Sequence, residues 1–437
     1  MKLLRIVLVL ILLVIVAAGG AYLWTTRHPE IAAIDPPDPA SFDPTLIEKG
    51  QQLSDLGACA VCHTREGGEP FAGGLDLPTP FGIIRTTNIT PDPDTGIGRW
   101  SEEAFRRAMR EGLGRRGEHL YPAFPYDHFT RVADEDISAI YAYLMTQPAV
   151  SYAPPANELR FPFNIRPLVE GWKFLFFDDA PFQADASRDE EWNRGAYLVT
   201  GLGHCGACHA PRNAFGAVRS SEGFAGGEAE GWYVPALGQA SHAPVPWTLD
   251  ALANYLFDGW DEHHGIAAGP MTPVVDHFYD VEEDDVFAMA AYLASLKEEP
   301  SEETVTAAAT AAAALDWATD ERPGGSGAPD DEALRRGEAL FFDQCVDCHK
   351  ARVSEQQPAS LAVTAPVNAP DARNLVNVVL HGIRPPRGSV QRQMPAFEGK
   401  VSDEELADIV AFVRWRFTDL PAWEDVGDTV ARARAGD

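Results

Sequence analysis

Every cysteine of this chain lies in one short pattern, Cys-x-x-Cys-His, and the pattern occurs three times. It is the pattern of covalent haem attachment, because two thiols at this spacing can add to the two vinyl groups of one porphyrin. The histidine that follows each pair is then held beneath the iron as its proximal ligand. The sequence therefore predicts three covalently attached haem c groups. Their residues are Cys59, Cys62 and His63; Cys205, Cys208 and His209; and Cys345, Cys348 and His349.

Two other functions of paired cysteines fit the sequence less well. A redox-active dithiol needs one Cys-x-x-Cys on a βαβ unit and does not need the histidine. A zinc site needs four ligands close together, but successive pairs lie over a hundred residues apart in the 437-residue chain. A pattern that recurs three times and uses all six cysteines favours haem.

The charge of the chain limits its partners. A formal net charge of -30 argues against binding to nucleic acid, whose phosphates would be repelled. With 45% hydrophobic and 23% charged residues, the composition is that of a globular protein. Two interpretations of the excess carboxylates stay open: attraction of a basic partner, or an acidic surface that is merely solvated.

The N-terminus has the features of a membrane anchor. Lys2 and Arg5 precede an uncharged stretch, Ile6–Trp24, which as a helix would be about 28 Å long, close to the hydrocarbon core of a bilayer. Small residues at 17–21 leave cleavage as a signal peptide open, although the length favours a retained helix. The two basic residues keep the N-terminus cytoplasmic. We therefore expect a cytoplasmic-membrane protein with its haem domains on the periplasmic side.

One helical plan recurs around each haem motif. A glycine precedes the first cysteine of each motif by eight to ten residues, and a middle helix follows the motif. Good N-cap residues precede the middle helices, and glycines suited to a C-terminal cap follow them. The glycines before the motifs are Gly50, Gly195 and Gly337, and the middle helices run from Ser101 to Gly112, from Thr248 to Gly259 and from Asp371 to Gly382.

Each repeat closes with an amphipathic helix, predicted at 134–145, 281–296 and 402–417. Matching aromatic residues lie in these helices, and each should face the glycine of the first helix so that the two helices cross closely. They are Tyr143, Tyr292 and Phe412. This pairing resembles that of class I cytochrome c domains. The predicted fold is therefore all-α, with three tandem class I cytochrome c domains behind an N-terminal transmembrane helix.

The segments between the repeats differ in composition. The first is rich in proline and aromatic residues, so we expect it to pack across the domains or on a partner, whereas the second has the composition of a flexible tether. The predicted boundaries are an anchor or signal at 1–30, domain 1 at 40–147, the aromatic segment at 148–185, domain 2 at 186–297, the flexible linker at 298–331, domain 3 at 332–420 and an acidic tail at 421–437.

Two methionines are candidates for the sixth iron ligand. A haem that only carries electrons usually has both axial positions filled, and methionine opposite histidine raises its potential. Met271 lies 62 residues after His209 (271−209), and Met394 lies 45 residues after His349 (394−349). Each lies beside a proline, in what we expect to be a loop before the last helix of its domain.

The first domain breaks this pattern. Phe124 lies 61 residues after His63 (124−63), nearly the interval seen in the second domain, and phenylalanine cannot bind iron. Three alternatives remain open: His128 or another nearby group is the ligand, the loop is shifted, or the iron is five-coordinate. Of these we favour His128 over an open site.

The sequence resembles the triple-haem cytochrome c subunits of bacterial membrane-associated dehydrogenases over nearly its whole length after the anchor. The segments that carry the resemblance are Cys59–Thr64, Phe71–Gly74, Thr79–Gly82, Thr87–Asp92 and Gly203–His209. The resemblance implies a subunit that takes electrons from a catalytic dehydrogenase subunit and delivers them to ubiquinone or to a downstream cytochrome or oxidase.

The resemblance also suggests a partner. In this family the catalytic subunits are quinoproteins, flavoproteins, or molybdenum hydroxylases that act on aldehydes or N-heterocycles. The alcohol and gluconate branches normally carry methionine at the position of Phe124, while Pro122–Phe129 and Trp260–Met271 are more similar to the molybdenum-hydroxylase branch. We therefore favour that partner.

The chain itself carries no sign of substrate chemistry. Its sequence shows no nucleophile–base constellation and no nucleotide-binding loop, so we expect an electron-transfer subunit and not an enzyme in its own right. The alternative is an open first haem with peroxidase-like or small-ligand-binding activity.

Overall fold

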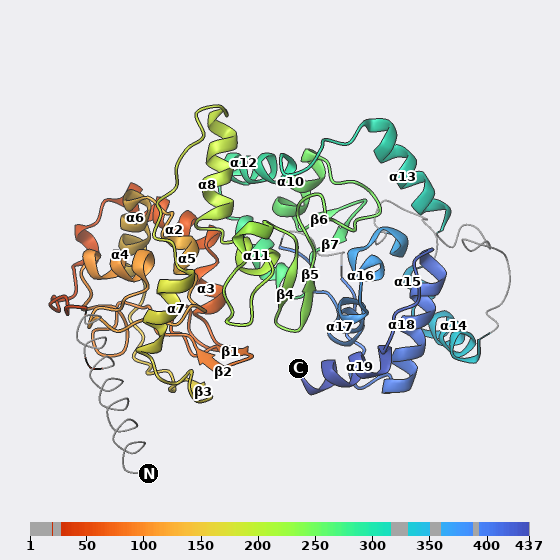
Figure 1. The fold of residues 1–437 in the computed structure, drawn as a ribbon, viewed down its shortest axis with the longest axis horizontal. Coiled ribbons are helices and arrows are strands. Elements are labelled where there is room, and N and C mark those ends of the chain that lie inside the picture. Colours follow the sequence, from red (N-terminus) through yellow and green to blue (C-terminus); the bar gives the residue numbers. More distant parts are fainter. Residues whose placement is uncertain (1–19, 21–27, 316–330, 350–359, 388–392, 437) are drawn as a thin grey trace, which may run out of the picture. The chain divides into compact units, whose positions relative to one another are not determined.

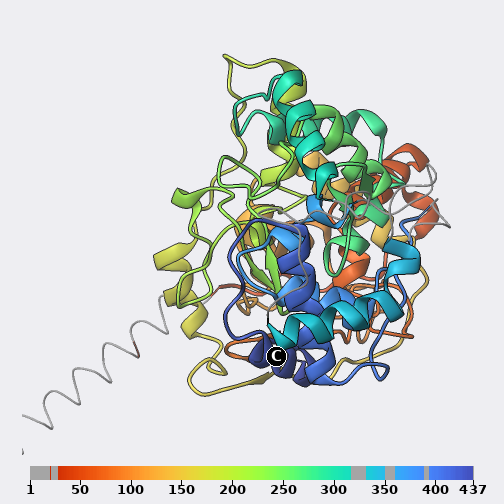
Figure 2. The same ribbon diagram turned by 90° about the vertical axis from the view of Figure 1, so that its right-hand side faces the viewer.

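The computed structural model describes residues 20, 28–315, 331–349, 360–387 and 393–436. These residues are mostly helical, with a few short antiparallel strands between the helices (Figures 1 and 2). They belong to two compact units, one of Met1–Ser54 with Cys62–Phe182 and one of Asp55–Val61 with Gln183–Asp437. The predicted membrane segment, Ile6–Trp24, lies outside the described residues except for Gly20. Within the described part of the chain, no helix is both long and apolar enough to cross a membrane.

Between residues 28 and 182 the helices alternate with one small sheet. The sheet has the antiparallel order β1-β2-β3, with Leu77 opposite Ile84 and Ile83 opposite Glu158. The elements are η1 (Pro39–Ser41), α2 (Pro44–Leu56), α3 (Cys59–Cys62), β1 (Asp76–Thr79), β2 (Gly82–Arg85), α4 (Glu102–Glu111), α5 (Tyr126–Phe129), α6 (Asp134–Met145), β3 (Glu158–Leu159) and α7 (Leu168–Phe176).

From residue 183 onward the same kind of succession occurs twice more. Two two-stranded ribbons, β4-β5 and β6-β7, belong to this part. Its elements are α8 (Glu190–Thr200), α9 (Gly206–His209), η2 (Ser220–Glu222), β4 (Gly227–Ala229), β5 (Trp232–Val234), α10 (Leu249–Asp258), β6 (Trp260–Asp261), β7 (Gly265–Ile266), α11 (Met271–Phe278), α12 (Glu283–Ala294), α13 (Glu302–Ala314), α14 (Glu332–Gln344), α15 (Val346–His349), η3 (Leu361–Val363), α16 (Ala365–Asn368), α17 (Arg373–His381), α18 (Asp403–Phe417) and α19 (Val426–Ala435).

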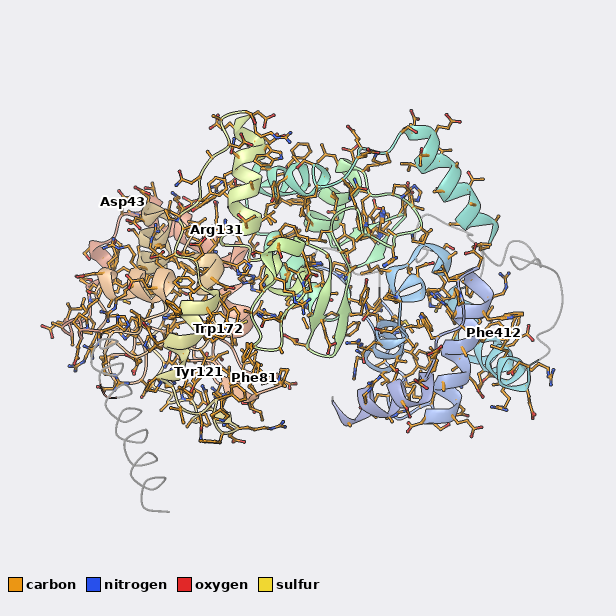
Figure 3. All side chains as sticks on the ribbon, in the orientation of Figure 1. Asp43, Phe81, Tyr121, Arg131, Trp172 and Phe412 are labelled. Carbon is orange, nitrogen blue, oxygen red and sulfur yellow. The ribbon has the colours of Figure 1, made fainter. Side chains whose placement is uncertain are left out.

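Three pairs of helices cross at a glycine: α2 with α6, α8 with α12, and α14 with α18. A Cβ added to any of these glycines would lie 1.9–2.1 Å from a backbone carbonyl oxygen of the partner helix and 2.8–2.9 Å from the Cβ of an aromatic residue. Only glycine allows so close a crossing, and the predicted pairing of glycine with aromatic residue is confirmed at all three places. The residues are Gly50, Ala139 and Tyr143; Gly195, Ala288 and Tyr292; and Gly337, Asp408 and Phe412, the last of which is labelled in Figure 3.

An ion pair lies beside each crossing. The residue directly before each glycine is basic, and its side-chain nitrogen lies 2.6 Å from a carboxylate of the partner helix. Two of the carboxylates precede the aromatic residue by seven positions and the third by four. These ion pairs were not predicted from the sequence. They are Lys49–Asp136, Arg194–Asp285 and Arg336–Asp408.

The middle helices have the predicted caps in two cases out of three. Ser101 and Thr248 each accept a hydrogen bond from a backbone N–H of the first turn, and Gly112 and Gly259 adopt the left-handed conformation at the C-terminal end. In the third, α17 begins at Arg373, one residue later than predicted. Gly382 at its end has φ of 71° with an extended ψ, which lies outside the left-handed helical region.

The aromatic segment 148–185 packs on the first unit. Strand β3 pairs with β2, and α7 lies against the end of α4. There the Lys173 Nζ donates hydrogen bonds to the carbonyl oxygens of Glu111 and Gly112, the latter at 2.9 Å. The Gly112 carbonyl also accepts a hydrogen bond from the Leu120 N–H, at 2.8 Å. A buried cation placed here pairs with carbonyls at the end of the helix and stabilises the negative end of the helix dipole.

Two predictions about the segments outside the domains need correction. The segment predicted as a flexible linker at 298–331 contains helix α13, because Ser301 caps it, alanine is the best helix former, and Ala312 is buried against the core of the third repeat. The predicted acidic tail at 421–437 contains helix α19, whose Val430 is buried in the same core. The predicted helical fold is confirmed for most of the described residues, which also contain short antiparallel strands.

A glycine substitution tests the close crossing. Changing Gly195 to alanine should lower the free energy of unfolding by about 1–3 kcal/mol, because the methyl group would overlap the Ala288 carbonyl. Urea denaturation followed by circular dichroism measures the change. Gly427 in α19 provides the matched control, since a Cβ there would meet nothing within 4 Å, so Gly427→Ala should be neutral or slightly stabilising. Equal stability of the two variants would contradict the crossing.

Candidate haem-binding sites

Each Cys-x-x-Cys-His motif forms a single helical turn that follows the first helix of its repeat. These turns are α3, α9 and α15. Residues three and four positions apart lie on the same face of a helix, so each turn presents two thiols and an imidazole on one side. All six cysteines are described, and none forms a disulfide. In each pair the first cysteine is half-buried and the second is exposed.

Two of the histidines are oriented by a backbone carbonyl. The Nδ1 of His63 lies 2.6 Å from the carbonyl oxygen of Thr87, and the Nδ1 of His209 lies 2.8 Å from that of Pro235. An Nδ1–H that donates to a carbonyl fixes the tautomer of the ring and leaves the Nε2 lone pair for a metal. This is the arrangement that a proximal iron ligand requires.

Burial shifts the pKa values of several side chains in the motifs. It lowers the pKa of His63 and of His209, although the hydrogen bonds to the carbonyls act in the opposite direction, so both rings are neutral at pH 7. Burial raises the pKa of Cys205 to about 12, with a smaller contribution from Cys208, and raises that of Cys345 to about 11. A neutral imidazole keeps its Nε2 lone pair available for iron.

Met394 lies with the third motif on one apolar core. Its backbone forms an isolated β-bridge with Ile383, through hydrogen bonds of 2.8 and 2.9 Å. Its side chain packs against the core of α14, α17 and α18, as do Cys345 and Val346 of the third motif. The structure thus brings the predicted ligand and its motif to the same cluster, and the role of Met394 as a ligand stays a prediction.

Met271 has a different setting from the one predicted. It is the first residue of helix α11, directly after Pro270, and so does not lie in a loop. Pro270 adopts helical backbone angles directly before α11, and Pro273 lies in the first turn of the helix, where proline is tolerated. Met271 still precedes the last helix of its repeat, α12, and its ligand role is likewise a prediction.

The first repeat has no methionine at the corresponding place. Phe124 is half-buried, and its ring centroid lies 5.3 Å from that of Phe129. His128 is buried in the four-residue helix α5, where its Nδ1 lies 3.1 Å from an oxygen of the neighbouring Asp127. That contact occupies Nδ1, so Nε2 is the ring nitrogen that could bind a metal. Whether His128 is the sixth ligand stays a prediction.

The roles of the Thr87 and Pro235 carbonyls were not predicted from the sequence. Every residue carries a carbonyl, so residue type gives no signal for this role. The available signal is the similar separation from the histidine, 24 residues in the first repeat (87−63) and 26 in the second (235−209).

Two parts of the chain match known protein families. Residues 47–148 match the cytochrome c family, and residues 332–413 match the family described as cytochrome c oxidase, cbb3-type, subunit III. Both matched ranges contain a Cys-x-x-Cys-His turn and a glycine crossing. Fold and site together define a c-type cytochrome with covalently bound haem.

Curated relatives extend the likeness to nearly the whole chain. A subunit of the nicotinate dehydrogenase of Pseudomonas putida is 46% identical over 93% of this chain, and the chain spans 33% of that relative's length. The gluconate 2-dehydrogenase cytochrome c subunit of Pantoea cypripedii is 36% identical, over 84% of this chain and 85% of the relative. The cytochrome c subunit of the quinone-dependent alcohol dehydrogenase of Gluconobacter oxydans is 34% identical, over 85% of this chain and 78% of the relative. The chain therefore belongs to the family of cytochrome c subunits of dehydrogenases.

Exchange of Met394 tests its predicted role. Met394→Leu removes a thioether but keeps an apolar side chain of similar size, so one haem should lose its sixth ligand, fall in potential and bind one equivalent of CO when reduced. CO titration and redox titration measure these changes. Met289→Leu is the control, because Met289 is buried in α12 and is not an expected ligand. Unchanged CO binding in Met394→Leu would contradict the assignment.

Proposed function

We propose that the chain is a triple-haem electron carrier that accepts electrons from a catalytic dehydrogenase subunit and passes them to ubiquinone or to a downstream cytochrome or oxidase. The observation that carries this proposal is the threefold repeat of a glycine crossing followed by a Cys-x-x-Cys-His turn. The relatives support it, since several are cytochrome c subunits of dehydrogenases.

The second repeat is part of the proposal, although the two family matches do not cover it. It has the close crossing at Gly195, the ion pair between Arg194 and Asp285, and a histidine, His209, whose Nδ1 faces a carbonyl. These features correspond to those of the first repeat. We therefore propose three cytochrome c domains, at 40–147, 186–297 and 332–420, each with one haem c.

The protein residues would control the electron carrier in three ways. Haem iron, when bound, supplies the one-electron chemistry by alternating between its ferric and ferrous states. The carbonyls of Thr87 and Pro235 hold His63 and His209 in the ligating tautomer. Met271 and Met394 would fill the distal positions of the second and third sites, and the first site would depend on His128 or another group. Around the third motif, the buried side chains of Phe341 and Phe412 would limit the access of water.

We also propose the partner and the location. The similarity to the nicotinate dehydrogenase of Pseudomonas putida supports a molybdenum hydroxylase as the catalytic partner, because nicotinate is an N-heterocycle. Ile6–Trp24 would anchor the chain in the cytoplasmic membrane, with the haem domains in the periplasm. Exposed apolar side chains along 161–175 support a surface that faces a partner or the membrane, since Phe174 is 88% exposed and Phe161 is 79% exposed.

Isolation of the complex tests the proposal. The full-length protein, tagged and purified from native membranes in mild detergent, should bring a catalytic subunit with a bound molybdenum cofactor, and substrate should then reduce its haems. The Cys345→Ala/Cys348→Ala variant should still bind that subunit but lack one reducible haem. Metal analysis and stopped-flow spectroscopy measure these outcomes. A cytochrome that is repeatedly isolated alone, or whose haems no co-purified subunit reduces, would contradict the proposal.

A further inference from the structure

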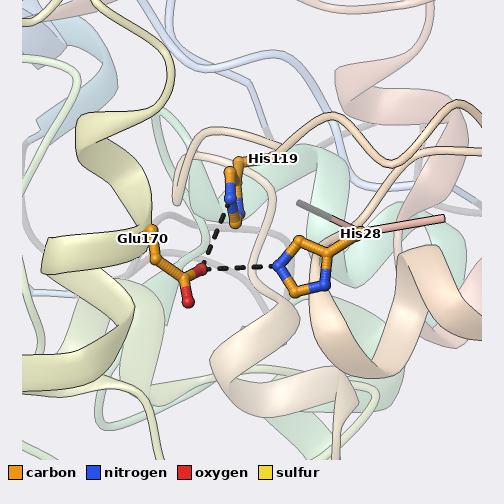
Figure 4. A group of neighbouring side chains, drawn as sticks. All are labelled: His28, His119 and Glu170. Atoms are coloured by element: carbon orange, nitrogen blue, oxygen red, sulfur yellow. Dashed lines mark ion pairs between the residues drawn. The ribbon is translucent and has the colours of Figure 1, made fainter. Parts of the chain in front are cut away.

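Two histidines and a glutamate from distant parts of the sequence meet in the first unit (Figure 4). His28 lies four residues after the uncharged stretch Ile6–Trp24, His119 lies in the loop after α4, and Glu170 lies on α7. None of them is an expected haem ligand. We propose that His28, His119 and Glu170 form a binding site for a divalent transition-metal ion, with zinc as the preferred metal.

The distances in this group are those of metal ligands. The Oε2 of Glu170 lies 3.3 Å from the Nε2 of His119 and 3.6 Å from the Nε2 of His28. Both separations exceed the usual range of about 2.7–3.2 Å for an N–H···O hydrogen bond. Around a tetrahedral zinc with bonds of about 2.0–2.1 Å, neighbouring ligand atoms lie about 3.3–3.4 Å apart. One potential ligand atom from each residue lies within 4.8 Å of the others, so small side-chain movements would complete the site.

Both imidazoles carry a nitrogen that the described protein leaves unsatisfied. Among the described residues, the Nε2 of His28 and the Nδ1 of His119 are buried and have no hydrogen-bond partner. Buried polar atoms of this kind are uncommon, and such an atom in a native protein often marks a missing water or ion. A metal ion on the Nε2 of His28 would satisfy one of the two directly.

The ligand atoms of the site favour zinc over calcium or magnesium. Burial and the nearby Lys173 lower the pKa of His119 to about 4, so its ring is neutral and able to bind a metal at pH 7. Lys173 and Arg166 bring positive charge, which opposes a cation, although both also donate hydrogen bonds to backbone carbonyls. One carboxylate is too little for a hard cation that selects oxygen ligands, whereas two imidazoles and a carboxylate are a common zinc set.

The metal ion would cross-link segments that are distant in the sequence. It would join three segments whose ligands are separated by 91 residues (119−28) and 51 residues (170−119). The first unit already holds the residues around His28, since Arg107 donates to the carbonyl of Pro29 and Arg115 pairs with Glu30 at 2.8 Å. A metal ion would join the segment around His28 to α7 and to the loop that leads to Phe124. Three protein ligands leave a fourth position for water.

Zinc analysis of the full-length, haem-loaded protein tests this inference. After equilibrium dialysis against zinc and removal of the free metal, the native protein should retain one zinc per chain, as measured by inductively coupled plasma mass spectrometry. His119→Gln and Glu170→Gln should each reduce the zinc to background without changing the haem content. His242→Ala, which removes a histidine outside the group, should retain it.

Thermal unfolding provides an independent measurement. Zinc should raise the melting temperature of the native protein and of His242→Ala but not of His119→Gln or Glu170→Gln, since a ligand stabilises only a fold that binds it. Native protein without zinc above background, or zinc retained in full by the His119 and Glu170 variants, would overturn the assignment. The haem count is unaffected by either result, so failure of the zinc site is separable from failure of the proposed electron-transfer function.

Discussion

The rest of the structure depends on three close helix crossings at glycine. At Gly50, Gly195 and Gly337 the backbone of one helix touches the backbone of another, and an aromatic residue lies next to each contact. The crossing fixes the direction of the first helix, and the haem motif follows within a few residues of its end. A basic residue beside each glycine adds an ion pair to the partner helix. The geometry of each motif is therefore set by a contact that permits almost no variation.

A second constraint orients the histidines of the motifs. A carbonyl from a later loop accepts the Nδ1–H of His63 and of His209, so the loop and the motif position each other. Such contacts around a metal ligand set its tautomer and its basicity. The Phe124 loop is where the first repeat differs from the others, and it also carries His119, the central residue of the proposed zinc site. The first repeat thus combines an altered distal side with a distinct set of contacts to α7.

Much of the architecture could be predicted from the sequence, because it follows from residue types with strong local preferences. Ser101 and Thr248 were recognisable as caps, and Gly50 and Tyr143 as partners, since they recur at matching positions. Alanine-rich α13 was misjudged because its composition also suits a linker, and only burial of Ala312 on a core distinguishes the two. The carbonyls of Thr87 and Pro235 could not be identified because every residue has a backbone carbonyl, so the residue type does not indicate this role. The cluster of His28, His119 and Glu170 depends on the packing of α7, which no local pattern reveals.

The central claim is that each of three motifs holds one covalently attached haem. Pyridine haemochrome analysis, combined with the intact mass of the purified protein, counts the attached groups directly. The account predicts three haems per chain, with one lost in each double-cysteine variant at 59/62, 205/208 or 345/348. A mature protein that carries fewer than three haems would contradict it.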